Sequence, residues 1–593
     1  MRLVVAVVLW AISIATLTWG IAQRTVFDAP ESIVRTITTD TKAPATIIHG
    51  DVLSAFPGRP TITVEGSVAA KIPNESGQGF STLQTSDVFV SYGRTIDVMA
   101  WLSPTRHTLL EFDVLLDSWS TLPRSGELYA PNPRGSDLWL QEFSGQDTVS
   151  ISVAAPEGMT VLIMSDGQFP APPIITLSWP VPNEAPWVLA ALIIGIVTMV
   201  AGFIAIILAI VHYRKNSGPR RRKTRRPRRV PRSRQRVAKR PAPPAPRRRG
   251  RRVAGFVATP ALGAMVLATM GCSSLALPEV PAEVLEEPLA ATAPYPAVTE
   301  LQFSKIMSQV SAQIRLADEE LSINTLGVRV EDPTLSARRT AYLVRRSDSE
   351  STELMAIPSS PIRLVMPQQT KTWPRSVFGI IQDEADVESP SLGVVLRQQD
   401  PRSQYHLTYV VVLNPQVTLP DLPAADLGAA KIAPDSKLIR TAPQEVLEHY
   451  SDVINNGAES VYSGEFSLLN DTLYSAIGPG AAQLRQESFG ETVSVEWKTS
   501  PADRDIVAFS TADGGAIVLG TLSEIETVSP LQSGAAINSS IAVRALTSVS
   551  QSSQGFDVES QIQTLWYVPP VGSTEGIRVL GFTYSLMGAK EVQ

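Results

Sequence analysis

Three long apolar stretches interrupt the mixed apolar and polar pattern of the chain, at residues 3–22, 187–211 and 253–271. A helix rises about 1.5 Å per residue, so about 20 residues cross a hydrocarbon core of roughly 30 Å. Residues 3–22 are predicted to form a transmembrane helix or signal anchor, and residues 187–211 a transmembrane helix. In the third stretch Pro260 and several glycines weaken a helix. It is expected to be either a third transmembrane helix or an internal lipoprotein-type signal.

Residues 25–185 alternate between apolar and polar positions with a period of two, which indicates half-buried strands. In the clearest run, Glu111 and Asp113 alternate with four apolar residues that would lie on the other face of the strand. These are Leu110, Phe112, Val114 and Leu116. Turn signals such as Ser165-Asp166-Gly167 separate the runs. The pattern predicts an extracytoplasmic all-β sandwich.

Residues 281–593 combine helical and strand patterns. Apolar residues at helical spacing predict one amphipathic helix, and these are Phe303, Ile306, Met307, Val310 and Ile314. Asp332 and Pro333 are expected to cap and begin the next helix. Strands with a period of two follow.

The same order recurs after a proline-rich stretch. A helix capped by Thr441 and ended by Gly457 is predicted, followed by strands with a hairpin turn at Asp513-Gly514. Helices followed by an antiparallel sheet, twice, resemble two nuclear transport factor 2-like (cystatin-like) units, at 281–425 and 440–593. The resemblance implies an α+β fold for this region, and units of this kind often enclose a cone-shaped pocket.

A strongly basic segment, residues 214–252, separates the second and third apolar stretches. It holds 20 of the 51 Lys and Arg residues and no acidic residue, so the rest of the chain carries 31 basic and 57 acidic residues. Short loops rich in Lys and Arg stay in the cytoplasm. We therefore expect a disordered cytoplasmic loop here and both folded regions outside the cell membrane. The loop suits anionic lipid headgroups, with nucleic acid or an acidic cytoplasmic protein as alternatives. Since the loop has no aromatic residue for base stacking, nucleic acid is disfavoured.

Cys272 is the only cysteine of the chain, and it follows the third apolar stretch directly. The order of arginines, apolar core and Gly271-Cys272 resembles a bacterial lipoprotein signal. In such signals a peptidase cuts before the cysteine, and the cysteine carries lipid. Thr269 and Met270 depart from the usual residues of such a signal. Two alternatives remain open: Cys272 is a lipid attachment site, or it emerges from a third transmembrane helix.

A second resemblance concerns the segments RVEDPTLSARRTAYLV, TWPRSVFGII and TAPQEVLEHYSDVINNG. They are similar to an uncharacterised family of actinobacterial envelope lipoproteins, over about residues 300–590. The resemblance implies a cell-envelope location and gives no chemistry.

The sequence predicts no catalytic or metal site and no cofactor. The histidines of the folded regions are too dispersed for zinc ligation or a Ser-His-Asp set, and they are His49, His107, His406 and His449. Aromatic residues could line a cystatin-like pocket or pack in cores, and they are Trp373, Trp497, Trp566 and Tyr584.

The expected architecture is a membrane-anchored multidomain protein. An all-β sandwich ectodomain and an α+β tandem cystatin-like region are joined by transmembrane helices and the basic disordered loop. Its expected function is non-enzymatic binding of an envelope protein or ligand. The alternative is an enzyme or carrier acting on an envelope lipid or glycan.

Overall fold

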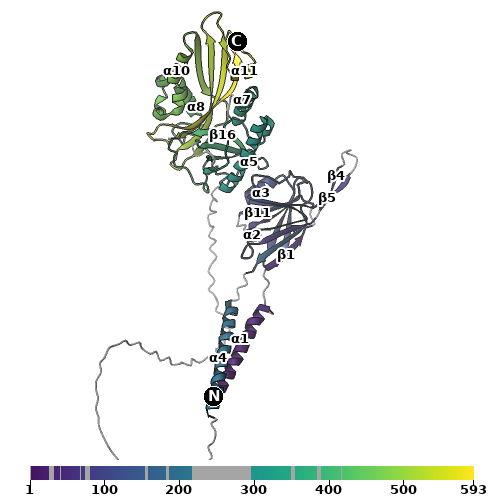
Figure 1. Ribbon diagram of the computed structural model, residues 1–593. Coiled ribbons are helices and arrows are strands. Elements are labelled where there is room, and N and C mark those ends of the chain that lie inside the picture. Colours follow the sequence, from purple (N-terminus) through teal and green to yellow (C-terminus); the bar gives the residue numbers. More distant parts are fainter. Residues whose placement is uncertain are drawn as a thin grey trace, which may run out of the picture. The chain divides into compact units, whose positions relative to one another are not determined.

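The structure is a computed structural model (Figure 1) that describes most of the chain. The described ranges are 2–25, 32–39, 42–66, 68–73, 80–153, 158–181, 186–216, 296–348, 354–383, 389–415 and 417–593. Most of the predicted basic loop, the third apolar stretch and Cys272 lie outside these residues. The chain divides into two compact units, one containing the first two apolar stretches and the other containing both sheet-rich regions.

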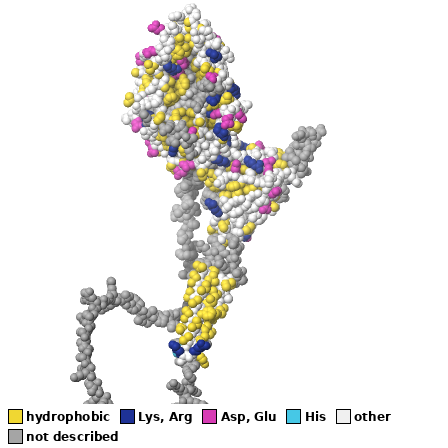
Figure 2. Space-filling model, viewed as in Figure 1, with side chains coloured by type: hydrophobic (Ala, Val, Ile, Leu, Met, Phe, Trp, Pro, Cys, Tyr) yellow, Lys and Arg dark blue, Asp and Glu magenta, His cyan; other side chains and the backbone are white. Residues whose placement is uncertain are grey.

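The first unit is a pair of apolar helices, α1 (Arg2–Thr25) and α4 (Pro186–Asn216). Both are long and apolar enough to cross a membrane, and Figure 2 shows apolar side chains covering the pair. Small residues allow close approach, since the Ser13 hydroxyl donates to the Gly195 carbonyl at 2.7 Å. Trp10 of α1 packs edge-on against Phe203 of α4. These contacts pair the two helices along their length.

The second unit begins with a sandwich of two sheets (residues 32–181), as the alternating pattern predicts. The smaller sheet contains, in spatial order, β1 (Ser32–Thr38), β12 (Ile174–Pro180), β3 (Thr61–Glu65) and β10 (Thr148–Ser152). The larger contains β8 (Ser118–Arg124), β7 (His107–Asp113), β2 (Ala45–His49), β11 (Met159–Met164), β6 (Asp87–Arg94) and β9 (Gln141–Gln146). Both sheets contribute to one buried core. The short helices are α2 (Gly50–Leu53) and α3 (Thr95–Leu102), and β4 (Val68–Pro73) pairs with β5 (Phe80–Thr85).

One predicted strand is shorter than its pattern. Strand β7 ends at Asp113, and Leu115 and Leu116 are exposed in the following turn. The Asp113 carboxylate accepts hydrogen bonds from the backbone N–H groups of both leucines, at 2.8 and 3.0 Å. This local bond competes with strand continuation, so the alternation predicts the wrong end for this strand.

The C-terminal region (residues 296–593) is built on one nine-stranded antiparallel sheet (Figure 1). Its spatial order is β13 (Ile362–Pro367), β14 (Arg375–Ile381), β15 (Leu392–Gln398), β16 (His406–Leu413), β23 (Arg578–Glu591), β22 (Phe556–Val568), β19 (Ala516–Pro530) and β17 (Val493–Pro501), with β18 (Val507–Ser510) paired to β19. A small antiparallel pair is formed by β20 (Ile537–Asn538) and β21 (Gln551–Ser552). The helices are α5 (Glu300–Glu320), α6 (Ile323–Leu326), α7 (Thr334–Ser347), α8 (Pro443–Asn456), α9 (Thr472–Ile477), α10 (Pro479–Phe489) and α11 (Ile541–Thr547).

Two predicted helix starts are displaced by one residue. Helix α7 begins at Thr334 with Pro333 as its N-cap, although the Asp332 carboxylate still accepts from the Ser336 N–H at 3.1 Å. Helix α8 begins at Pro443 after Ala442, whereas the Thr441 hydroxyl donates to Glu465 instead of capping the helix. Proline at the first helical position explains this start, because its missing N–H needs no partner there.

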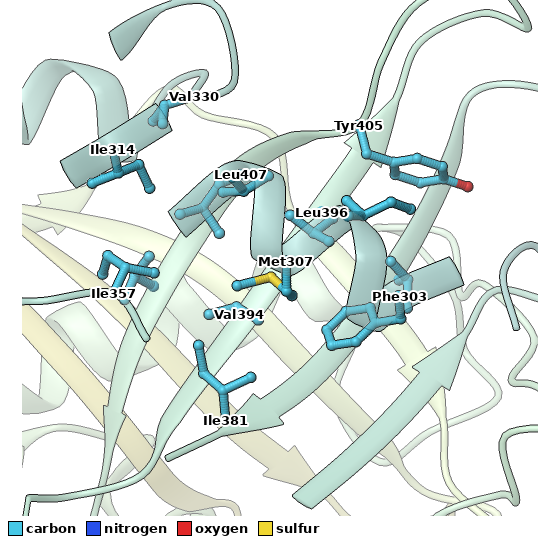
Figure 3. Packing of buried hydrophobic residues seen from close by; sticks show 14 of the residues in the cluster. Phe303, Met307, Ile314, Val330, Ile357, Ile381, Val394, Leu396, Tyr405 and Leu407 are labelled. Atoms are coloured by element: carbon cyan, nitrogen blue, oxygen red, sulfur yellow. The ribbon is translucent and has the colours of Figure 1, made fainter. Parts of the chain in front are cut away.

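Three apolar clusters hold the C-terminal region together. The first lies between α5 and β14 to β16, and Figure 3 shows Phe303 and Met307 facing Val394 and Ile381. All five residues predicted to share a face of α5 are fully or almost fully buried. A second cluster lies under α8 and α9. In the third, side chains of β14 to β16 meet those of β18, β19 and β22.

The two predicted cystatin-like units share this sheet. Strand β16, the last of the first half, pairs with β23, the last of the second, through Val412 with Phe582 and Leu413 with Gly581. The third cluster takes residues from both halves. The halves therefore complete one another's core.

Candidate binding site at the junction of the sandwich and the C-terminal region

The sandwich and the C-terminal region meet through a buried ion pair. The Arg329 guanidinium donates to both oxygens of Asp137, at 2.6 and 3.2 Å. The backbone N–H of Tyr405 donates to the same carboxylate at 2.7 Å. Asp137 is 2% exposed and Arg329 4%. Fork geometry and a third donor offset much of the desolvation that a buried pair costs.

A second buried ion pair crosses the same junction. Arg375 of β14 donates to Asp97 of α3 at 2.7 Å, and both residues are fully buried. The other Asp97 oxygen accepts from Arg94 at 2.7 Å. The Arg375 guanidinium lies 3.6 Å from the ring centroid of Trp373, a cation–π contact. Asp97 is thus paired with one arginine from each region.

Further hydrogen bonds cross the junction in both directions. Arg402 donates to the Thr105 hydroxyl at 2.6 Å and to the Trp101 carbonyl at 3.1 Å. Gln302 at the start of α5 donates to the Leu138 carbonyl at 3.1 Å. In these contacts the C-terminal region supplies the donors, whereas Arg94 of the sandwich donates to the Ala297 carbonyl at 2.6 Å. Desolvation by burial lowers the pKa of Arg402.

An apolar groove with a volume of about 970 Å³ lies beside these contacts. It is lined from the sandwich by Ile96, Met99 and Met159 and from the C-terminal region by Pro296 and Leu301. Leu301 is 83% exposed, although it occupies the first turn of a helix with a buried face. The lining also includes Arg94, Lys371, Glu300 and Asp426. An apolar floor with a few charged groups is typical of binding sites.

A smaller groove, of about 320 Å³, lies between α7, α11 and β23. Tyr584 lines it and donates its hydroxyl to Glu524 at 2.6 Å. Glu524 is 1% exposed, and its second oxygen has no hydrogen-bond partner among the described residues. Desolvation by burial raises the pKa of Glu524, against the smaller effect of the Tyr584 hydrogen bond. Arg485 lies 3.8 Å from the same carboxylate.

The four aromatic residues singled out from the sequence do not line one pocket. Trp566 is buried in the cluster under α8 and packs edge-on against Tyr450. Trp497 lies under Arg485 at 4.8 Å, whereas Trp373 belongs to the junction. Of these four residues, Tyr584 lines the groove between α7, α11 and β23.

The four histidines also lie apart, and no metal-binding cluster occurs among the described residues. His449 stacks on Tyr462 at 3.7 Å and pairs with Glu465 at 2.9 Å. His406 lies 3.6 Å from Glu331. Both histidine side chains therefore have partners within the fold.

Sequence reasoning missed the junction. Its residues come from distant segments, and Asp97 precedes Arg375 by 278 positions. In the sequence, Arg375 is a charged residue within an apolar run. Such a run predicts a strand but does not identify the partner of the charge. Cys272, the predicted lipid attachment site, lies outside the described residues and keeps its two alternatives.

Comparison with known proteins gives one family match. Residues 328–591 match the family model described as Domain of unknown function (DUF8094). This segment follows α6, ends with β23 and includes Arg329, Arg375 and Arg402 of the junction. No curated protein and no solved structure matches the chain.

Proposed function

We propose that the protein is a non-enzymatic cell-envelope membrane protein whose joined sandwich and C-terminal region bind an envelope protein outside the cell membrane. The apolar groove at the junction carries the proposal. Neither region forms it alone, because Met99 and Met159 come from one region and Leu301 from the other. Docking of the two regions would therefore create the binding surface.

The acidic balance of both folded regions supports a protein partner or neutral ligand over an anionic surface. Outside residues 214–252 the chain carries 31 basic and 57 acidic residues. A surface with this balance repels anionic lipids and wall polymers. Exposed apolar area bordered by charges is the usual character of a protein contact.

Photocrosslinking from the groove tests this function. A photoreactive amino acid at Leu301 is expected to capture one predominant partner in intact membranes. Leu469, which is 93% exposed and lies outside the groove, is the matched control position. Capture of the same species from both positions, or of none from Leu301, would contradict the proposal. A captured small molecule would favour a ligand over a protein.

The proposed topology places residues 214–252 in the cytoplasm and both folded regions outside. The two apolar helices and the basic segment that follows α4 support it. Protease added to intact spheroplasts is then expected to digest the sandwich and the C-terminal region and to spare an epitope in the basic segment. Permeabilised cells are the control, since all three parts become accessible there. Protection of residues 296–593 in intact spheroplasts would reverse the proposed topology.

The finer fold and family proposals rest on element order and on local similarity. Each half of the C-terminal region runs from helices into antiparallel strands, which supports cystatin-like units. Similarity to actinobacterial envelope lipoproteins fits an envelope location. Lipid on Cys272 is tested by labelled palmitate in the wild type and in Cys272→Ala. Equal labelling with one full-length species in both would favour the third transmembrane helix.

The alternative function is an enzyme or carrier for an envelope lipid or glycan. The groove beside α7 favours it, because Tyr584 links the groove to the buried carboxyl group of Glu524. A buried acid next to an apolar groove is suited to proton transfer. Loss of turnover or lipid transfer in Glu524→Gln, with the fold intact, would support this alternative. Unchanged activity would remove it.

A further inference from the structure

We infer that the sandwich and the C-terminal region bind each other as two separable partners, so that the chain keeps its assembled form after a cut between them. The interaction surface is the face of the sandwich around Asp97 and Asp137. Its partner is the arginine-bearing face of the C-terminal region, with Arg329, Arg375 and Arg402. This inference rests on the junction contacts and does not depend on what the groove binds.

The contacts have the composition of a specific protein interface. Arginine and tryptophan are enriched at the centres of such interfaces, and this junction contains three arginines from one side with Trp101 from the other. Arg402 donates to the Trp101 carbonyl and also lies 5.3 Å from its ring centroid. Trp373 packs against the sandwich cluster that contains Trp101. Polar and apolar contacts are therefore interleaved.

Charge complementarity gives the partner its chemistry. The sandwich presents two carboxylates, and the C-terminal region presents a guanidinium to each. Both pairs are at least nine-tenths buried, so solvent and salt screen them weakly. A like-charged or uncharged face would leave Asp137 buried without a counter-charge and Asp97 with Arg94 alone. The surface thus selects a partner with fixed arginines.

A long connection separates the two regions. Residues 182–295 separate the last described residue of the sandwich from Pro296. The effective concentration that a connecting chain provides falls steeply as the chain lengthens. Docking must therefore draw on the contacts themselves. Cleavage before Cys272, one of its two alternatives, would then yield two products that remain together.

A protease cut in the full chain tests the inference. A recognition site for a sequence-specific protease is inserted between Ala282 and Glu283. This position lies after both candidate anchors, the third apolar stretch and Cys272, so the cut leaves the sandwich as the holder of the C-terminal region. Membrane fragments accessible from both sides are cut and washed. The C-terminal product is expected to stay with the membranes at a ratio near one to one with the N-terminal product.

Two substitutions and one control make the result specific. Asp137→Asn and Asp97→Asn each leave an arginine without its counter-charge, and each is expected to weaken retention at least about 100-fold. Asp117→Asn removes an exposed ion pair with Arg35 and is expected to leave retention unchanged. Thermal unfolding of each uncut chain verifies that both regions remain folded. Release of the wild-type C-terminal product, or equal retention in all variants, would overturn the inference.

Discussion

At the scale of single residues, the buried carboxyl groups of Glu524 and Asp471 differ in the number of hydrogen bonds that they make. Glu524 shares a hydrogen bond with Tyr584 and leaves one oxygen without a partner among the described residues. Asp471 has more partners, because it caps α9 and also accepts from the Tyr450 hydroxyl at 2.7 Å. The two residues therefore respond differently to substitution.

Replacing Glu524 is expected to change how stability depends on pH. Burial raises the pKa of Glu524 above its ordinary value of 4.5, so the folded protein binds this proton more tightly than the unfolded chain. Its contribution to stability falls as the pH rises from about 4.5 through the folded-state pKa. Glu524→Gln is expected to remove this decline. Chemical denaturation between pH 4 and 8 measures it.

Glu526→Gln is the matched control for this measurement. Glu526 lies on the same strand and pairs with Arg485 at 2.8 Å. Its substitution is expected to leave most of the decline in place, because burial raises the pKa of Glu524 more than the Glu526 charge does. A wild type whose stability rises steadily over this pH range, with Glu524→Gln unchanged from it, would show that Glu524 stays ionised in the fold.

Asp471→Ala is expected to destabilise the C-terminal region by about 3 kcal/mol, since it removes a helix cap and leaves the Tyr450 hydroxyl unsatisfied. Ser540→Ala provides the comparison. Ser540 caps α11 by accepting from the Val543 N–H at 3.2 Å and has no second role in the contacts described. Its loss is expected to cost about 1 kcal/mol. Equal costs in thermal unfolding would mean that the Tyr450 contact contributes nothing.

At the scale of elements, sequence periodicity predicted faces better than ends. All five residues assigned to one face of α5 are buried, and Gly457 ends α8 in the positive-φ region as expected. The predicted end of β7 was wrong because the Asp113 carboxylate accepts hydrogen bonds that close a local turn. The start of α8 shifted because Pro443 is favoured at the first helical position, whereas Pro333 is the N-cap of α7 and not its first residue. Faces depend on many residues, whereas ends depend on one or two.

The packing of α5 on β14 predicts a sensitive glycine. A Cβ added at Gly379 would clash with the Phe303 ring, which is fully buried. Gly379→Ala is expected to lower the free energy of unfolding by about 2 kcal/mol. Gly588→Ala in β23 is the control, because an added Cβ meets no atom within 4 Å there. Denaturant unfolding distinguishes the two, and equal effects would contradict this packing.

At the scale of the whole molecule, local patterns predicted two sheet-rich regions and two membrane-length helices, but not how the regions combine. The shared sheet depends on the pairing of β16 with β23, whose paired residues are about 170 positions apart. The junction depends on partners more than 190 positions apart. A period of two or 3.6 residues carries no information on such pairing. The candidate groove was therefore not predictable from the sequence.

The shared core predicts that the halves of the C-terminal region do not fold separately. Residues 296–415 alone would expose Phe378, Val395 and Tyr409, which the second half covers. We expect this fragment to lack a cooperative thermal transition, whereas residues 296–593 should unfold in one transition. Circular dichroism on both fragments measures this. A stable, cooperatively melting first half would contradict the shared core.

The order of the junction residues along the chain also sets a timetable for biosynthesis. The sandwich strands are complete at Pro180, and the ribosome reaches Arg375 195 residues later. At 5 to 20 residues per second, that interval is about 10 to 39 s. Until its partner is made, Asp137 lacks Arg329, and Asp97 has only Arg94 of the sandwich as a counter-charge. A nascent chain is thus vulnerable to competing cationic proteins at this surface, and the delay ends only when β14 has been made.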